Sequence, residues 1–228
     1  ALGFTFLDEN GNDVGEGAQA LAKVDTVQTQ GRLPELKECR FRIACDVINP
    51  LCGDDGATFV YGPQKGVTDD MKQPLDMAMA HFADVTATAL GKDLRDVPGT
   101  GAAGGLGFAF LSYLNARLTP GIDLILDAVK LEDELADADI VVTGEGRLDF
   151  QTAMGKAPVG VARLAKKHGA KVIAFAGGVT KEARACNGAG IDAFFPVVRG
   201  VTTLEEAMNP KNARANVTDT AEQVFRLM

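Results

Sequence analysis

The sequence predicts an α/β fold with a parallel sheet in its C-terminal half. Three short runs there have the β-branched and apolar composition of buried strands, at 140–142, 171–175 and 191–198. Glycines and then a helical pattern follow each of the first two runs, an order that implies parallel strands joined by right-handed crossovers. Pro196 inside the third run favours a strand end or the edge of the sheet.

Composition limits the classes of protein that fit. The chain has 228 residues, 46% hydrophobic and 24% charged, so it can bury a core. Its formal net charge of -8 argues against a surface for nucleic acid or anionic membrane. No apolar run approaches the roughly 18 residues of a membrane helix, and no basic leader is followed by an apolar segment, so we expect a cytoplasmic protein. The four cysteines lack metal-ligand spacing and indicate reduced thiols.

The N-terminal part begins with a predicted strand at 4–7, a turn at 8–13 and a second strand at 39–46. Two loops follow in quick succession on either side of an apolar run at 59–61. Turn chemistry alone would explain the Asn-Pro and Gly-Pro pairs in them, whereas polar loop residues are also frequent binding groups. The candidate side chains in these loops are Asp46, Asn49, Gln64 and Lys65.

Apolar residues at helical spacing predict a long helix over 68–90, with its regular part expected after Pro74 because proline fits only a first turn. A glycine-rich loop at 98–105 then enters a second helical pattern at 106–118. Such a loop offers backbone N–H groups and a helix dipole to a phosphate or carboxylate, although glycines also allow close helix packing.

A further helix is predicted over 120–136, and a final one over 219–228. Near Pro120 the glycine loops give way to regular β-α-β order, which places a domain boundary there. We therefore expect one domain at 1–120 and a second at 121–228.

The polar residues that follow the strand at 140–142 form the strongest candidate site. Open α/β sheets bind ligands beyond the carboxyl ends of their strands, and we expect a loop here. Pro158 then suits the first turn of a helix that ends near Gly169. Within a few residues the predicted loop gathers both signs of charge and neutral hydrogen-bonding groups: Glu145, Arg147, Asp149, Gln151, Thr152 and Lys156.

Two phosphate-binding signatures fail on closer inspection. Gly155-Lys156 precedes alanine and lacks the earlier glycine of a Walker A loop. Gly99, Gly101 and Gly104 match G-x-G-x-x-G by letter, but no strand precedes them, which argues against a nicotinamide dehydrogenase.

Four motifs in a fixed order carry a family resemblance. They are Ala44-Cys-Asp-Val-Ile-Asn-Pro-Leu-Cys-Gly53, Tyr61-Gly-Pro-Gln-Lys-Gly66, Pro98-Gly-Thr-Gly-Ala-Ala-Gly-Gly105, and Thr143-Gly-Glu-Gly-Arg-Leu-Asp-Phe-Gln-Thr152 followed by Gly155-Lys-Ala-Pro158. In these motifs the sequence resembles the bacterial class I glycerate kinases, the glycerate 2-kinase family.

The resemblance implies two α/β domains, one Rossmann-like with a parallel sheet and the other smaller and inserted, with the active site in the cleft between them. It makes 1–120 a partial inserted domain and 121–228 the C-terminal part of the Rossmann-like domain. It also implies an N-terminal segment of the same protein as a partner, and a homodimer is a further expectation.

The implied activity is transfer of the ATP γ-phosphoryl group to D-glycerate, with Mg²⁺, giving 2-phosphoglycerate and ADP. The alternatives are a kinase that forms 3-phosphoglycerate and a nucleotide- or metabolite-binding module without catalysis. Phosphoryl transfer needs a phosphate cradle, carboxylates for Mg²⁺ and for the proton, and cations.

The candidate residues divide among these tasks. Catalysis falls to Asp46, Asp149, Lys65 and Lys156, and either aspartate is a candidate for facing the metal. Substrate binding falls to Arg147, which can grip a carboxylate with two hydrogen bonds, and to Asn49, Gln151 and Thr152. Nucleotide binding falls to Gly99, Thr100, Gly101, Gly104, Gly105, Gly144 and Glu145.

Overall fold

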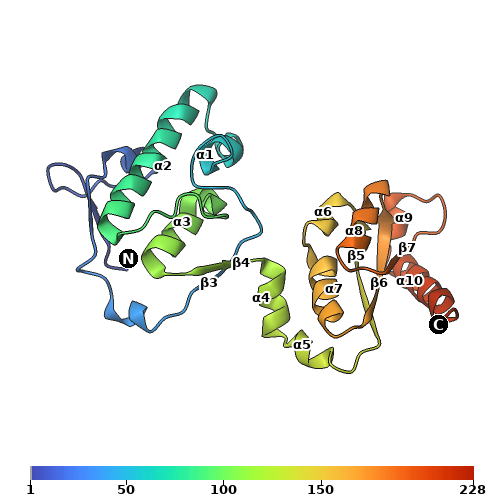
Figure 1. Cartoon of the computed structure of the whole chain (residues 1–228). Helices are drawn as coiled ribbons and strands as arrows, with labels where there is room; N and C mark the ends of the chain where they lie inside the picture. The colour runs from blue at the N-terminus through green and yellow to red at the C-terminus, as the bar shows by residue number, and fades with distance from the viewer. Residues whose placement is uncertain (1) are drawn as a thin grey trace. The chain divides into compact units, whose positions relative to one another are not determined.

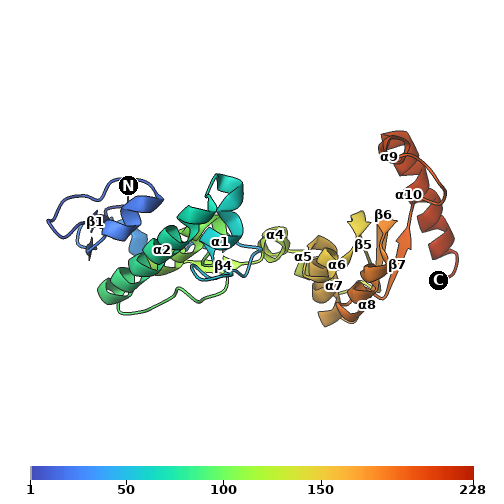
Figure 2. The same ribbon diagram turned by 90° about the horizontal axis from the view of Figure 1, so that it is seen from above.

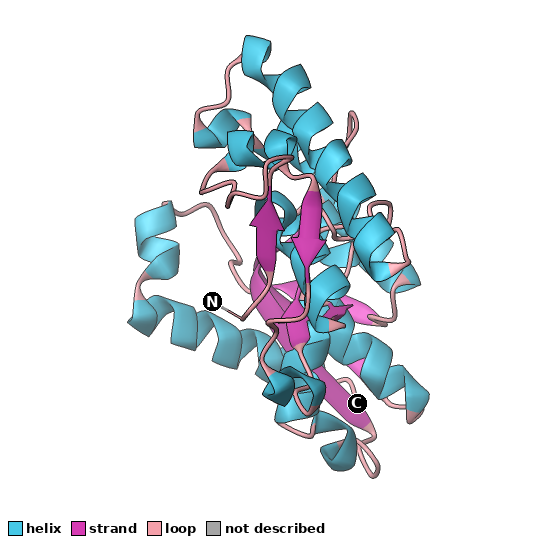
Figure 3. Cartoon of the chain, turned by 90° about the vertical axis from the view of Figure 1, so that its left-hand side faces the viewer, coloured by secondary structure: helices cyan, strands magenta, loops and turns pink. Residues whose placement is uncertain are grey.

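The computed structural model describes residues 2–228 and has a mixed α/β architecture with parallel strand pairs (Figure 1). The chain forms two compact units, Ala1–Gly121 and Ile122–Met228, which we call the N-terminal and C-terminal units. Helices make up more of the ribbon than strands do (Figure 3). No helix in the described part of the chain is long and apolar enough to cross a membrane.

The N-terminal unit contains two small sheets. β1 (Thr5–Leu7) pairs antiparallel with β2 (Thr26–Gln28). β3 (Arg42–Ala44) pairs parallel with β4 (Arg117–Thr119), so that distant parts of the sequence lie side by side. Both strands predicted in this part of the chain are therefore present, although each is shorter than its apolar pattern.

Helix α2 (Asp69–Leu90) is the longest element of the N-terminal unit (Figure 1). It begins five residues before Pro74, so the expected start after the proline is wrong. The proline is tolerated because it lies on the exposed face, where water can reach the carbonyl of Asp70 that loses its partner. The apolar run at 59–61 belongs to a short helix, α1 (Ala57–Tyr61).

Two apolar groups hold the N-terminal unit together. One is a core cluster beneath α1 and α2 that includes Leu51, Met79, Ala83 and Phe108. The other is a set of rings in edge and stacked contacts at centroid distances of 5.1–6.3 Å. Its members are Phe4, Phe6, Phe82, Phe108 and Tyr113.

The glycine-rich loop leads into α3 (Ala102–Leu114), as the sequence predicts. The helix is interrupted at its start, because Ala103, Gly104 and Gly105 have φ of 51°, 73° and 97°. Three successive left-handed residues cannot continue a right-handed helix, so the regular part follows them. Short 3-10 helices complete this unit: η1 (Ala18–Lys23), η2 (Pro34–Lys37) and η3 (Pro63–Lys65).

The single helix predicted at 120–136 is instead two, α4 (Gly121–Ala128) and α5 (Leu131–Glu134). They are separated at Lys130, which has a left-handed φ of 53°. A left-handed residue breaks the α-helical hydrogen-bond series, whatever the apolar spacing of its neighbours.

The C-terminal unit is built on a parallel sheet of three strands in the order β5-β6-β7. β5 (Ile140–Leu148) and β6 (Lys171–Val179) are nine residues each, and β7 (Ala193–Pro196) ends at the proline on the sheet edge, as predicted. Both longer strands run on through their glycines. The loop expected after residue 142 is therefore wrong over 143–148.

Helices cover both faces of this sheet (Figure 2). Val172 and Ala174 of β6 belong to the core cluster that includes α7 (Ala157–Lys167), whereas Ile173 and Phe175 alternate toward α10 (Pro210–Phe225). This alternation is that of a strand buried on both sides. The remaining helices are α6 (Phe150–Ala153), η4 (Lys181–Arg184), α8 (Ala185–Gly188) and α9 (Leu204–Met208).

Candidate functional site

The end of β5 places two predicted site residues, Glu145 and Arg147, on a paired strand. Gly144 makes this possible, because a Cβ there would lie 2.2 Å from the carbonyl oxygen of Phe175 on β6. Only a glycine lets the two strands approach this closely. Gly146, by contrast, has open space beside it.

Asp149 directly follows β5 and caps the short helix α6. Its Oδ1 accepts hydrogen bonds from the backbone N–H groups of Gln151 at 2.9 Å and Thr152 at 3.2 Å. In return, the Thr152 hydroxyl accepts from the backbone N–H of Asp149 at 3.1 Å. This reciprocal capping box fixes the carboxylate of Asp149 relative to the backbone.

Thr152 is fully buried, and its hydroxyl also donates a hydrogen bond to Oε1 of Glu145. One hydroxyl thus links the strand residue Glu145 to the capping residue Asp149. Cys186 is buried beneath them, with its Sγ 4.0 Å from the carbonyl oxygen of Asp149. Burial raises the pKa of the Cys186 thiol, and the charges of Glu145 and Asp149 raise it further.

Lys156 adds a cation to this group. Its Nζ lies 3.8 Å from Oδ1 of Asp149, and the two side chains are 43% and 28% exposed. A pair this exposed adds little stability to the fold. We call Glu145, Asp149, Thr152 and Lys156 the acid–lysine cluster.

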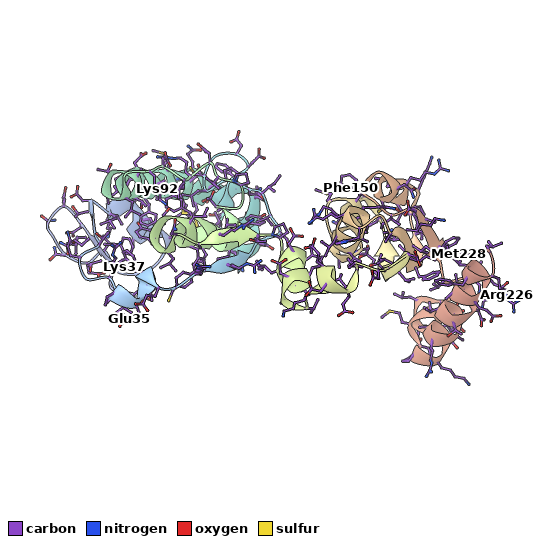
Figure 4. The ribbon with its side chains drawn as sticks, turned by 60° about the horizontal axis from the view of Figure 1, so that its bottom comes forward. Glu35, Lys37, Lys92, Phe150, Arg226 and Met228 are labelled. Carbon is purple, nitrogen blue, oxygen red and sulfur yellow. The ribbon has the colours of Figure 1, made fainter. Side chains whose placement is uncertain are left out.

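Two other predicted residues, Gln151 and Arg147, lie next to this cluster along the chain. Gln151 is exposed, and only its backbone N–H bonds to Asp149. Arg147 is also exposed. The pKa of Glu182 is lowered, first by the dipole of its own backbone N–H and in smaller part by the positive charge of Arg147. The neighbouring Phe150 is 60% exposed (Figure 4).

In the N-terminal unit, Asp46 follows β3 by two residues and is exposed. Its Oδ1 accepts a hydrogen bond of 2.8 Å from the backbone N–H of Gly121. The N–H groups at the start of a helix need such acceptors, and Gly121 begins α4. Asp46 therefore stabilises the start of that helix, whatever else it does.

Asn49 makes three hydrogen bonds inside the N-terminal unit. Its Nδ2 donates to the carbonyl oxygen of Asp55 at 2.8 Å, and its Oδ1 accepts from the hydroxyl of Tyr61 at 2.6 Å. Its own carbonyl oxygen accepts from the backbone N–H of Gly101 at 2.9 Å. These bonds tie Asn49 to α1 and to the glycine-rich loop.

Several backbone N–H groups of the glycine-rich loop already donate hydrogen bonds within the N-terminal unit. The N–H groups of Thr100, Gly101 and Gly104 donate to carbonyl oxygens of Val97, Asn49 and Gly101. Thr100 is fully buried, and its hydroxyl bonds to the carbonyl oxygens at 95 and 97. These three N–H groups are therefore not free to cradle a phosphate in this conformation.

Packing explains several of these glycines. A Cβ on Gly101 would lie 2.2 Å from the carbonyl oxygen of Pro50, and one on Gly99 would lie 2.9 Å from Sγ of Cys45. Gly105 would meet Cε of Met79 at 2.8 Å. Gly104 alone among the loop glycines named above has nothing within 4 Å.

Gly104 opens onto a groove of about 700 Å³ in the N-terminal unit. The groove is also lined by Lys65 and Gln64 of the second predicted loop, so the structure brings this loop and the glycine-rich loop to one place. The sequence gives no sign of the apolar residues that complete the groove, because they come from segments far apart in the chain: Ala18, Leu21, Tyr61, Leu75 and Met79.

No group of three or more His, Cys, Asp or Glu side chains that could hold a metal ion occurs among residues 2–228. The two aspartates predicted to face Mg²⁺ belong to different units, Asp46 to the N-terminal and Asp149 to the C-terminal unit. The donor set fits a Mg²⁺ that takes one or two protein carboxylates and is held otherwise by phosphate oxygens and water, which is the usual arrangement for this ion.

Comparison with known proteins agrees with these motifs. A family model described as the glycerate kinase family matches residues 1–228. A glycerate kinase of Bacillus subtilis (strain 168) is 47% identical over 207 residues, 91% of this chain and 54% of that protein. A glycerate 2-kinase of Escherichia coli (strain K12) is 45% identical over the same shares.

A crystal structure from Salmonella typhimurium LT2, described as a candidate glycerate kinase 2, superposes with a TM-score of 0.77 at 40% identity. It covers 98% of this chain, which corresponds to 60% of its own. The chain therefore belongs to the glycerate kinase family, and the resemblance seen in its four motifs is confirmed. The chain spans about half the length of the B. subtilis and E. coli relatives.

Proposed function

We propose that the protein to which this chain belongs transfers the γ-phosphoryl group of Mg-ATP to D-glycerate, giving 2-phosphoglycerate and ADP. Membership of the glycerate kinase family supports the reaction class, and the name of the E. coli relative, glycerate 2-kinase, favours the 2-hydroxyl. The single observation that carries the proposal is the acid–lysine cluster. It holds a carboxylate and a cation together at the carboxyl end of a parallel strand.

The reaction needs few protein groups. The 2-hydroxyl oxygen of glycerate attacks the γ-phosphorus, the bond from that phosphorus to the β,γ-bridging oxygen breaks, and the hydroxyl proton passes to a carboxylate. We assign the two carboxylate tasks, the proton and the metal, to Asp149 and Asp46. Lys156 and Lys65 stabilise negative charge on the phosphoryl oxygens, and Arg147 binds the carboxylate of glycerate with two parallel hydrogen bonds.

Magnesium, when bound with ATP, supplies positive charge at the β- and γ-phosphates. Other residues predicted from the sequence take supporting roles in the proposal. Thr152 positions Glu145 and Asp149 from the interior, and Asn49 positions the glycine-rich loop. Gly144 allows the strand approach that places Glu145, and Gln151 is an exposed hydrogen-bonding group for substrate.

The test uses a protein of full family length, which we call the joined protein, made by replacing the aligned part of the Haemophilus influenzae glycerate kinase with this chain. That relative aligns with all of this chain, which corresponds to 60% of its own length. ADP release from Mg-ATP is measured with and without D-glycerate, for the joined protein and for the chain alone. We expect glycerate-dependent turnover of about 1 to 100 s⁻¹ in the joined protein.

Two substitutions test the cluster. Asp149→Asn is expected to lower kcat by about 10²- to 10⁴-fold, whereas Asp133→Asn, at an exposed site on α5, serves as the matched control. Near-normal activity of Asp149→Asn would refute the assignment. Titration with Mg²⁺ separates the two carboxylate tasks, because a metal ligand's variant needs more Mg²⁺ whereas a base's variant stays slow at saturation.

Product analysis by ³¹P NMR against authentic standards distinguishes the regiochemistry. A 3-phosphoglycerate signal would overturn the 2-hydroxyl assignment while leaving the kinase class intact. A joined protein that is folded and binds nucleotide, yet releases no glycerate-dependent ADP, would instead support a binding module.

A further inference from the structure

The groove of the N-terminal unit combines an apolar body with a single charge. Its volume of about 700 Å³ lies in the range of small-molecule sites, which are mostly apolar with a few polar groups. Among the described residues that line it, Lys65 is the only one with a charged side chain. In a chain with a formal net charge of -8, a groove with a cation and no acid in its lining favours an anionic ligand.

The apolar part of the groove is held in place by the surrounding structure. The ring of Tyr61 lines it, and the Tyr61 hydroxyl is fixed by its 2.6 Å hydrogen bond to Oδ1 of Asn49. Leu75 and Met79 of α2 also line it, and Met79 belongs to the buried core. An aromatic ring fixed at its polar end is a stacking surface for a flat ligand.

The polar part of the groove has space for phosphates. Lys65 is exposed, and Gly66 after it has the left-handed φ of 93° that ends the turn carrying Lys65. Gly104 lines the same groove and has no atom within 4 Å of the position where a Cβ would stand. The backbone at Gly104 is therefore open to close approach by a ligand, whereas the neighbouring glycines are packed.

We propose that this groove binds an adenine nucleotide, with the base against Tyr61 and the apolar floor, and with the phosphates at Lys65, in the space left open beside Gly104. The N–H of Gly104 donates to Gly101, so in this conformation Lys65 supplies the charge and Gly104 supplies only the space. This inference rests on the proposed kinase function and adds to it the place where the nucleotide binds. It lies wholly within the N-terminal unit, so binding can be measured apart from catalysis.

The experiment measures the affinity of the joined protein and of the 228-residue chain for a fluorescent ATP analogue, with unlabelled ATP as competitor. Lys65→Ala is expected to weaken binding about tenfold or more, and Lys65→Arg to restore most of it, because the loss is that of a charge-assisted contact. Lys92→Ala is the matched control, since Lys92 is an exposed lysine beyond the end of α2 (Figure 4).

A second pair of variants tests the base site. Ala18 is exposed and lines the groove at the start of η1, so Ala18→Trp fills the groove without disturbing the core and is expected to abolish binding. Ala22→Trp, at an exposed position of the same 3-10 helix outside the groove, is expected to change the affinity less than twofold. Circular dichroism confirms that each variant is folded.

Adenosine and tripolyphosphate, used as separate competitors, distinguish base from phosphate recognition. Competition by adenosine that Ala18→Trp abolishes supports the inference. Competition by tripolyphosphate but not by adenosine, together with normal binding of the ATP analogue by the Ala18→Trp variant, would overturn the inference. Unchanged affinity for the analogue in both Lys65→Ala and Ala18→Trp would also overturn it. If both variants bind normally but the joined protein releases ADP when glycerate is present, the groove inference fails and the kinase function stands. If the groove binds the nucleotide as expected but glycerate causes no ADP release, the kinase function fails and the groove remains a nucleotide site.

Discussion

The replacement of Thr152 by valine tests whether one buried hydroxyl holds the acid–lysine cluster together. Valine keeps the shape of threonine and its apolar contacts, so the change isolates the hydroxyl. That hydroxyl donates to the Glu145 carboxylate and accepts from the backbone N–H of Asp149. A hydrogen bond to a charged group contributes about 1.5–3 kcal/mol, and a capping interaction about 1 kcal/mol.

Because Glu145 and Asp149 are partly exposed, we take the lower end of these ranges and expect Thr152→Val to cost about 2–3 kcal/mol. Thr152→Ser is the matched control, since it keeps the hydroxyl and loses one buried methyl group, at a cost of about 1 kcal/mol. The cost of Thr152→Val is therefore the contribution of the hydroxyl, and the comparison with Thr152→Ser shows whether it exceeds that of one buried methyl group.

Cys186 supplies the assay, because its buried thiol lies next to the carbonyl oxygen of Asp149 and reacts only when this region opens. The chain lacks tryptophan, so labelling by N-ethylmaleimide with peptide mass analysis is more informative than intrinsic fluorescence. Thr152→Val should speed labelling of Cys186 about 30- to 150-fold, and Thr152→Ser about fivefold.

Cys52 belongs to the N-terminal unit and provides an internal control, since its labelling should stay unchanged in both variants. Equal labelling of Cys186 in Thr152→Val and Thr152→Ser would refute the reasoning. It would mean that the hydroxyl contributes no more to the capping box and the position of Glu145 than one buried methyl group does.

Three further predictions test the fold of the two units. Gly144→Ala should lower the free energy of unfolding, measured by urea titration, by about 1–3 kcal/mol, because its Cβ would meet the carbonyl of Phe175. Gly146→Ala is the control and should be neutral or slightly stabilising, since the space beside Gly146 is open. Equal effects of the two changes would contradict the packing argument. Burial raises the pKa of Tyr113 to about 12, so the free energy of unfolding should fall as pH rises above 10, where the unfolded tyrosine ionises first, and Tyr113→Phe should remove this fall. Burial likewise raises the pKa of Asp76, so the folded state binds its proton more tightly, and the free energy of unfolding should decline as pH rises from the ordinary value of 3.8. In urea titrations at a series of pH values, Asp76→Asn should flatten that decline. A parallel decline in the variant would reject the assignment.

Local patterns predict much of this fold. The β-branched run at 140–142 and the helical spacing of 68–90 each identify an element that the structure contains. The extension of β5 to Leu148 was not predictable in this way, because glycine carries no side-chain signal. Its strand conformation depends on pairing with β6, which lies far along the chain.

The sequence indicated which charged residues lie together in the site, but not which of its polar side chains are buried. The short spacing between Asp149 and Lys156 suggests a joint role, and the structure brings their charged groups to 3.8 Å. Thr152 and Thr100 read in the sequence as polar loop residues open to ligands, yet both are fully buried. Burial depends on what packs over a residue, such as Cys186 near Thr152, and local sequence does not contain that information.

Asn49 couples the local unfolding of three segments of the N-terminal unit. Its three hydrogen bonds join the turn at Asp55, the helix that ends at Tyr61 and the loop at Gly101. Segments joined through one residue lose their support together, so none of them can fray alone at low cost. Amide hydrogens in these segments should therefore exchange with solvent at a common rate, as one cooperative unit, and a nucleotide that binds at Tyr61 would slow exchange as far away as Gly101.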